Sequence, residues 1–180
     1  MVQLHRYNDE ELKELLSSMV IIYDSNEKEN NHILEYLDKK KVQYKKMKLN
    51  FGDYSFYLPA NEKLGIHRDL YFTDVVTVER KGSLEELSGN FTKGRANIEE
   101  EFNRKRGAMY LMVENATYED IINHNYKTEY KPLSYLATLN SFEARYNLKT
   151  AFVKRQAAGN FIYHKFLYYL REYFVRGLAN

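Results

Sequence analysis

The chain has 180 residues, of which 44% are hydrophobic and 29% charged, and its formal net charge is +2. This length suits a single domain, and the apolar fraction is too high for a disordered chain. The sequence contains no cysteine, which excludes disulfides, thiolate metal sites and a cysteine nucleophile. The longest stretch without a charged residue, 132–142, is about half of what a membrane-spanning helix needs. We therefore expect an intracellular protein with no membrane segment.

The first half of the chain predicts alternating helices and strands. Apolar residues at helical spacing predict a helix from Asn8 or Asp9 to about Ser18, and another over 27–41. β-Branched and alternating apolar runs predict four strands, over 19–23, 42–49, 53–58 and 75–79. Residues 60–74 resemble a loop with room for a short hairpin.

The second half continues the alternation. Helices are predicted from Ser83 to about Phe91 and over 96–106, 118–123, 133–146 and 160–177, and strands over 108–114 and 150–153. Such alternation predicts an α/β domain of three layers, in which helices flank a central mixed β-sheet.

Charged residues lie at the ends of several predicted central strands, where α/β domains commonly place their sites. They are Asp24, Glu27, Asp53, Glu79 and Lys81. Glu79 and Lys81 are two apart on one strand and so share a face, whereas Arg80 points to the other face. With Asp53 from the neighbouring strand, the set has two carboxylates and one ammonium around a shared point.

This set is the outline of a phosphodiester-hydrolysing site. Two carboxylates suit Mg²⁺ or Mn²⁺, which keep several waters for a substrate phosphate to displace. A lysine beside the metal can orient or deprotonate a water and can stabilise charge on the phosphate. A Glu-x-Lys pair alone, however, is more commonly a surface ion pair at a strand end. The five histidines have no metal-ligand spacing, and we predict none as a ligand or general base.

The residues around this set follow a recognisable order. Gly52-Asp53 precedes Glu79-Arg80-Lys81, and Glu85 follows after three further residues. This order resembles the Gly-Asp, Glu-Arg-Lys and Asp signature in the nuclease domain of XPF-type structure-specific endonucleases, which include Mus-type and archaeal Hef-type enzymes. Glu85 replaces the final aspartate of that signature.

Two flanking segments also resemble this family, and the resemblance covers about residues 19–154. Asp24-Ser25-Asn26-Glu27 stands where the family has a DSRE-like motif, with Asn26 in place of arginine. Gly94-Arg95 and then Glu99 stand where the family has Gly-Arg and a helical Gln.

The resemblance implies a restriction-endonuclease-like core and a set of roles. Asp53 and Glu79 would bind Mg²⁺ or Mn²⁺, with Asp24 as a further acid and catalytic residue beside the metal. The backbone carbonyl of Arg80 would add a ligand, and Lys81 would be the catalytic lysine. The expected supporting residues are Glu27, Glu85 and Arg95.

Nucleic-acid binding is expected from local basic clusters, because a net charge of +2 is too small to indicate it. Most basic runs are solvated faces. The predicted contacts are Lys93, Arg95, Arg104 and Lys154.

The leading hypothesis is a metal-dependent DNA endonuclease acting on branched or structured DNA such as flaps, forks or junctions. The alternatives are a DNA-binding or dimer-partner module with little activity, and a restriction-type or RNA-acting nuclease. We expect residues 1–180 to form one nuclease domain without a helix-hairpin-helix domain, and the short chain would suit a phage or mobile element.

The C-terminal helical segment, about 156–178, carries apolar and aromatic residues around its whole circumference. Such a helix must be enclosed, either within its own domain or by a second copy. Because the family resemblance implies dimerisation through C-terminal helices, we expect a homodimer through this segment.

Overall fold

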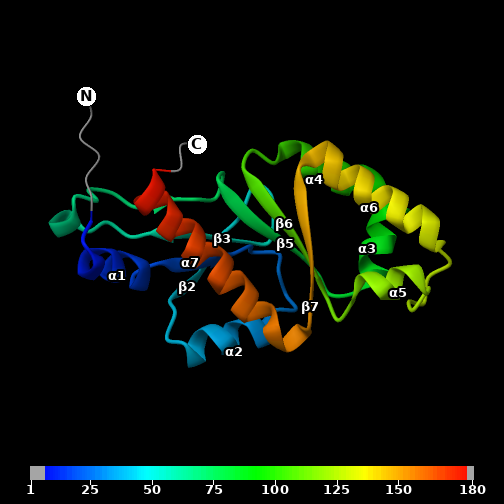
Figure 1. Ribbon diagram of the computed structural model, residues 1–180, viewed down its shortest axis with the longest axis horizontal. Coiled ribbons are helices and arrows are strands. Elements are labelled where there is room, and N and C mark those ends of the chain that lie inside the picture. Colours follow the sequence, from blue (N-terminus) through cyan, green and yellow to red (C-terminus); the bar gives the residue numbers. More distant parts are fainter. Residues whose placement is uncertain (1–6, 178–180) are drawn as a thin grey trace.

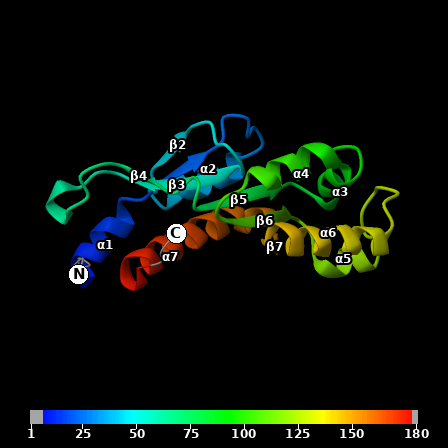
Figure 2. The same cartoon turned by 90° about the horizontal axis from the view of Figure 1, so that it is seen from above.

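A mixed seven-stranded β-sheet forms the middle layer of the molecule, and helices cover both of its faces (Figures 1 and 2). The computed structural model describes residues 7–177. The strands are β1 (Val20–Tyr23), β2 (Tyr44–Lys46), β3 (Tyr54–Leu58), β4 (Leu70–Tyr71), β5 (Val76–Lys81), β6 (Ala108–Glu114) and β7 (Leu148–Val153). The α-helices are α1 (Asp9–Ser17), α2 (Asn31–Lys39), α3 (Leu84–Phe91), α4 (Arg95–Arg104), α5 (Tyr118–Ile122), α6 (Pro132–Tyr146) and α7 (Ala158–Arg176). The predicted three-layer α/β fold is confirmed.

The strand order brings the ends of several neighbouring strands to one edge of the sheet. The order is β2-β1-β3-β5-β6-β7, with β4 paired to β3. β5, β6 and β7 are parallel, and β3 is antiparallel to its neighbours β1 and β5. The carboxyl ends of β1, β5, β6 and β7 therefore meet the amino end of β3. This edge carries the charged residues that the sequence places at strand ends.

Two separate hydrophobic cores lie on the two faces of the sheet. Side chains of α1, α2 and α7 form one core, and side chains of α3, α4, α5 and α6 form the other. β6 contributes to both because its side chains alternate: Met112 packs into the first core, and Leu111 and Val113 pack into the second. The sheet is thus buried on both faces, which explains why its central strands are continuous apolar runs.

Most predicted boundaries agree with the structure, and two differences affect the site. α2 begins at Asn31 rather than Glu27, so residues 24–30 form a loop at the edge of the sheet where the strand ends meet, which is called the functional edge below. β5 continues to Lys81, two residues beyond the predicted end, because Arg80 and Lys81 pair with β6. Residues 60–74 contain a short 3₁₀ helix, Glu62–Leu64, and β4, which pairs with β3 as a short hairpin.

α7 packs along α2 and α1 (Figure 1) and buries one side of its circumference. Ile162, Phe166 and Leu170 are completely buried on that side, whereas Tyr168 is 59% exposed. Its own domain therefore encloses only part of the predicted apolar helix. Residue 178 of the predicted C-terminal segment and His5 lie outside the described residues. None of the described helices is long and apolar enough to cross a membrane.

Candidate active site

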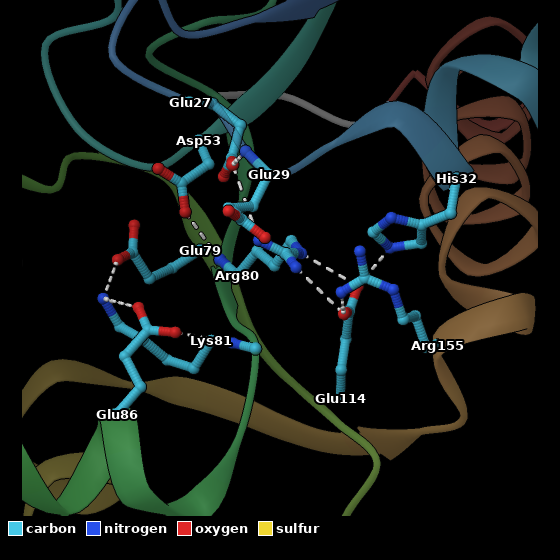
Figure 3. Close-up of polar contacts among 11 residues, drawn as sticks. Glu27, Glu29, His32, Asp53, Glu79, Arg80, Lys81, Glu86, Glu114 and Arg155 are labelled. Carbon is cyan, nitrogen blue, oxygen red and sulfur yellow. Dashed lines mark hydrogen bonds and ion pairs between the residues drawn. The ribbon is translucent and has the colours of Figure 1, made fainter.

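Asp53, Glu79 and Lys81 converge at the functional edge of the sheet (Figure 3). Lys81 Nζ lies 2.7 Å from Glu79 Oε1, as expected for two residues that share one face of β5. Both side chains line a cavity of about 330 Å³ together with Asp53. The second carboxylate oxygen of Glu79, Oε2, is buried and contacts no hydrogen-bond donor among residues 7–177. The structure thus brings together the three residues of the proposed site.

Gly52 fixes the position of Asp53. Its φ of +72° is in the left-handed region, and a Cβ at this position would lie 2.8 Å from Thr77 Cβ. Only glycine fits this turn without displacing β5. From the turn, Asp53 Oδ2 accepts a hydrogen bond of 2.8 Å from the backbone N–H of Arg80. The Gly-Asp pair therefore has a physical reason: the glycine allows the approach, and the aspartate reaches the end of β5.

Burial and mutual repulsion perturb the carboxyl groups of the site. Burial raises the pKa of Asp53 to about 7, against the lowering effects of Lys81 and of the Arg80 N–H. Burial, followed by repulsion from Asp53, raises the pKa of Glu79 well above its usual value. Burial lowers the pKa of Lys81, but Glu79 and Asp53 outweigh it, so the net shift is upward. The carboxylates of Glu79 and Asp53 thus stabilise the ammonium form of Lys81.

Asp24 lies at the same edge but is already occupied by donors. Its Oδ2 accepts from the N–H of Leu49 at 2.6 Å, and its Oδ1 accepts from the N–H of Asn26 at 2.8 Å. Lys48 Nζ also lies 3.3 Å from Oδ1. These contacts tie the loop after β1 to the loop after β2. Asp24 lines the cavity of Asp53 and Glu79 as a buried acid that also braces both loops.

On the other face of β5, Arg80 belongs to a second charged cluster (Figure 3). Arg80 Nε and Nη2 donate to the two oxygens of Glu114, at the end of β6, at 2.8 and 2.9 Å. His32 Nε2 also lies 2.7 Å from Glu114 Oε1. Burial would raise the pKa of Glu114, but the hydrogen bonds from Arg80 and His32 outweigh it and lower that pKa. This cluster clamps the end of β5 to the end of β6.

Glu27 and Arg155 border the same cluster. Arg80 Nη1 lies 3.4 Å from Glu27 Oε1, and Arg155 Nη1 lies 3.4 Å from Glu114 Oε2. Glu27 and Arg155 also line a cavity of about 570 Å³ that reaches Asp53 and Lys81. The expected supporting acid Glu27 therefore contacts Arg80.

The structure does not bring every predicted residue to this edge. Glu85 accepts from the backbone N–H of Lys127 at 3.0 Å, and its neighbour Glu86 instead lies 4.0 Å from Lys81 Nζ. The reason is that adjacent residues of α3 point in directions about 100° apart. Arg95 pairs with Glu99 at 3.0 Å and lies over the ring of Phe142 of α6.

The predicted DNA contacts fall in different places. Arg104 lines the cavity of Asp53 and Glu79, and its Nε donates to the backbone carbonyl of Asn50 at 3.3 Å. Lys93 and Lys154 are exposed and line none of the cavities at this edge. Of the four predicted basic residues, only Arg104 therefore borders the site.

Several residues at the site were not singled out from the sequence. Glu101 of α4 lines the cavity of Asp53, and its Oε1 accepts from the N–H of Gly52 at 3.1 Å. Glu99, which stands where the family has a helical Gln, pairs instead with Arg95 and Arg145.

The donors of the main cavity fit a hydrated divalent cation. No three His, Cys, Asp or Glu side chains within 7–177 are close enough together to enclose a metal ion. Mg²⁺ and Mn²⁺, however, are commonly held by one or two carboxylates, with waters and substrate oxygens as the remaining ligands. Asp53 and the unpartnered Oε2 of Glu79 supply this donor set.

Comparison with known proteins gives an independent assignment. The family model of the ERCC4 domain matches residues 23–165. XPF from Aeropyrum pernix superimposes with a TM-score of 0.58 at 16% sequence identity, covering 89% of this chain and 62% of that chain. XPF from the same organism in complex with DNA gives a TM-score of 0.57 at 17% identity, covering 89% of this chain and 68% of that one. No curated protein matches the chain significantly. The match over most of the sequence and the shared fold show that this chain belongs to the ERCC4 family, the family of the XPF-type nuclease domain.

Proposed function

We propose that this protein is a Mg²⁺- or Mn²⁺-dependent DNA endonuclease that acts on branched or otherwise structured DNA. One observation carries the proposal: Asp53, Glu79 and Lys81 line one cavity, and within it Glu79 keeps a buried oxygen that has no hydrogen-bond partner in the described part of the chain. A purely structural ion pair would leave no reason to bury that oxygen unpaired, because an unsatisfied buried acceptor is destabilising.

The residues have separate roles in this proposal. Asp53 and Glu79 hold the cation, with the backbone carbonyl of Arg80 as a further ligand, and Asp24 is the adjacent acid. When bound, the ion polarises the phosphate and lowers the pKa of an attacking water. The ammonium of Lys81, 2.7 Å from Glu79, stabilises negative charge that develops on the phosphate.

In this proposal, basic residues beside the cavity bind the phosphate backbone of the DNA. A neighbouring cavity of about 640 Å³ is lined by Lys48, Arg104, Lys105 and Arg106. It shares Lys48 and Arg104 with the cavity of Asp53. Lysine and arginine beside an acidic cavity would hold the phosphates next to the scissile one, because backbone phosphates are the principal source of affinity for DNA. Lys93, Arg95 and Lys154 would contact the flanking duplex.

The test is cleavage of labelled flap, fork, junction, linear duplex and single-stranded DNA, with Mg²⁺, Mn²⁺ or EDTA. We expect cleavage of a branched substrate with either metal and none in EDTA. Asp53→Asn and Glu79→Gln should each abolish cleavage and retain the fold, because each removes a charge at constant volume. Near-wild-type turnover by either variant would reject the assigned site. Binding of branched DNA without cleavage by the wild-type chain would instead favour the binding-module alternative.

We also propose that the domain forms a homodimer through α7. The exposed side of this helix carries Phe161, Tyr168 and Tyr169, which with Tyr110 line a cavity of about 460 Å³. Tyrosine suits such an interface because it combines a large apolar ring with a polar tip. Light scattering at micromolar concentration should give twice the monomer mass of 21.5 kDa, and Tyr168→Glu should lower it. A monomeric mass for the wild-type chain would reject this interface.

A further inference from the structure

We propose that Glu101 completes the cation site from α4, holding the Gly52-Asp53 turn with one carboxylate oxygen and the hydrated cation with the other. This inference rests on the function proposed above. Glu101 Oε1 accepts the Gly52 N–H at 3.1 Å, and no donor among residues 7–177 contacts Oε2. Glu101 lines the same cavity as Asp53 and Glu79. The side chain thus reaches from the helical layer to the turn that positions Asp53.

A second observation points to a ligand in this cavity. Glu79 is only 2% exposed, and its Oε2 lacks any donor in the described part of the chain. A buried carboxylate oxygen in this state needs a partner, because removing a charge from water without compensation is costly. Asp53 also lines the cavity, and among the described residues its carboxyl accepts only the Arg80 N–H. A cation would satisfy both groups.

Charge balance gives Glu101 a specific function. Asp53 and Glu79 carry two negative charges when ionised, and Lys81 cancels one of them. Glu101 restores a second net negative charge, which matches a divalent cation. The other cations at the cavity are already paired: Lys48 with Asp24, and Arg104 with Glu100. Of the acids that line this cavity, Asp24 pairs with Lys48 and Glu79 with Lys81, so Asp53 and Glu101 are the two without a basic partner among residues 7–177.

The position of Glu101 on α4 separates it from its acidic neighbours. Glu99 pairs with Arg95 and Arg145, and Glu100 pairs with Arg104. Neither lines the cavity of Asp53. Since three consecutive helical residues face three directions, only Glu101 reaches the turn. Its contact through a metal-bound water agrees with the lack of three enclosing acids among the described residues.

The test measures Mn²⁺ binding to the intact chain without DNA, by electron paramagnetic resonance of the free ion. Glu101→Gln keeps an amide oxygen for the Gly52 N–H but removes the charge. We expect its Kd for Mn²⁺ to rise about tenfold or more. Changes of this size are typical when the replaced residue contacts a ligand of the metal rather than the metal itself. The metal-free Tm should stay near that of the wild type. Glu99→Gln, the control on the same helix, should change the Kd less than twofold.

The outcomes separate this inference from the proposed function. An unchanged Mn²⁺ Kd for Glu101→Gln would overturn the role of Glu101, while loss of binding in Asp53→Asn would still support the site itself. Unchanged binding in Asp53→Asn and Glu79→Gln would reject the proposed function as well. If Glu101→Gln does not fold, Glu101→Asp and Glu101→Ala replace it: Asp, which keeps the charge, should bind Mn²⁺ more tightly than Ala. Equal affinities of these two variants would overturn the inference.

Discussion

Glu114 should be a principal determinant of stability, although it lies outside the metal-binding residues. Its carboxylate is completely buried, accepts two hydrogen bonds from Arg80 at 2.8 and 2.9 Å, and contacts His32 and Arg155. Glu114→Gln keeps the shape but removes the closest counter-charge of the buried Arg80 guanidinium, whose other acidic neighbour, Glu27, lies 3.4 Å away. Removing one partner of a buried ion pair costs about 3–5 kcal/mol. Because the amide oxygen of Gln still accepts one hydrogen bond, we expect about 3 kcal/mol.

Thermal unfolding followed by circular dichroism measures this loss. For a domain of this size, 1 kcal/mol corresponds to about 2–4 °C in Tm, so Glu114→Gln should lower the Tm by about 6–12 °C. Glu129→Gln removes an exposed charge and should change stability by less than about 0.5 kcal/mol. Arg80→Met combined with Glu114→Met should be less destabilised than Arg80→Met alone, since it removes the buried charge of Glu114 together with that of Arg80. If Glu114→Gln lowered the Tm by less than about 2 °C, this reasoning would be refuted.

Three further predictions concern the site. The metal-free Tm of the wild type relative to that of Asp53→Asn should fall as the pH rises from about 4 to about 7, because the raised pKa of Asp53 lets the folded state bind a proton that the unfolded state has lost; a constant difference between the two chains would contradict it. Lys81→Met should lower the single-turnover cleavage rate about 10²-fold or more, whereas Lys93→Met should weaken DNA binding and its salt dependence; equal loss of rate in both would contradict the separation. Gly52→Ala should destabilise the protein by about 1–3 kcal/mol in chemical denaturation, because φ there is +72° and Thr77 blocks the added Cβ; unchanged stability would show that the turn can relax.

The fold could be predicted from the sequence because its signals are local. The apolar run 108–114 corresponds residue for residue to β6, and α1 starts where predicted, with Asn8 as its N-cap. The start of α2 was predicted too early because Glu27 and Lys28 fit a helical pattern. In the structure, Glu27 contacts Arg80 instead of continuing a helix, and a contact across 53 residues leaves no local signal.

The site could be predicted in part for the same reason. Glu79 and Lys81 share a strand face by simple alternation, so their 2.7 Å contact follows from spacing. Glu114 looked like the ordinary polar end of a buried strand, and its partners Arg80, His32 and Arg155 come from three other segments. Glu101 was hidden in an acidic run, where only the rotation of α4 decides which carboxylate faces the cavity. Long-range packing determines which of these side chains reach the site, and the periodicity of the sequence carries no information about that packing.

The central position of β5 and β6 has a consequence for motion. Each of these two strands has a neighbouring strand on either side, and nearly all residues of both strands are buried. Their backbone amides should exchange with solvent only on global unfolding, whereas the amides of 24–30 and 47–53 should exchange through local opening. Glu79 and Lys81 therefore stand on the slowest-exchanging part of the protein, and Asp24 and Asp53 stand on loops that open more readily. Asp24 and Asp53 would therefore reach a cation from loops that open more readily, while Glu79 and Lys81 would reach it from a strand that stays in place.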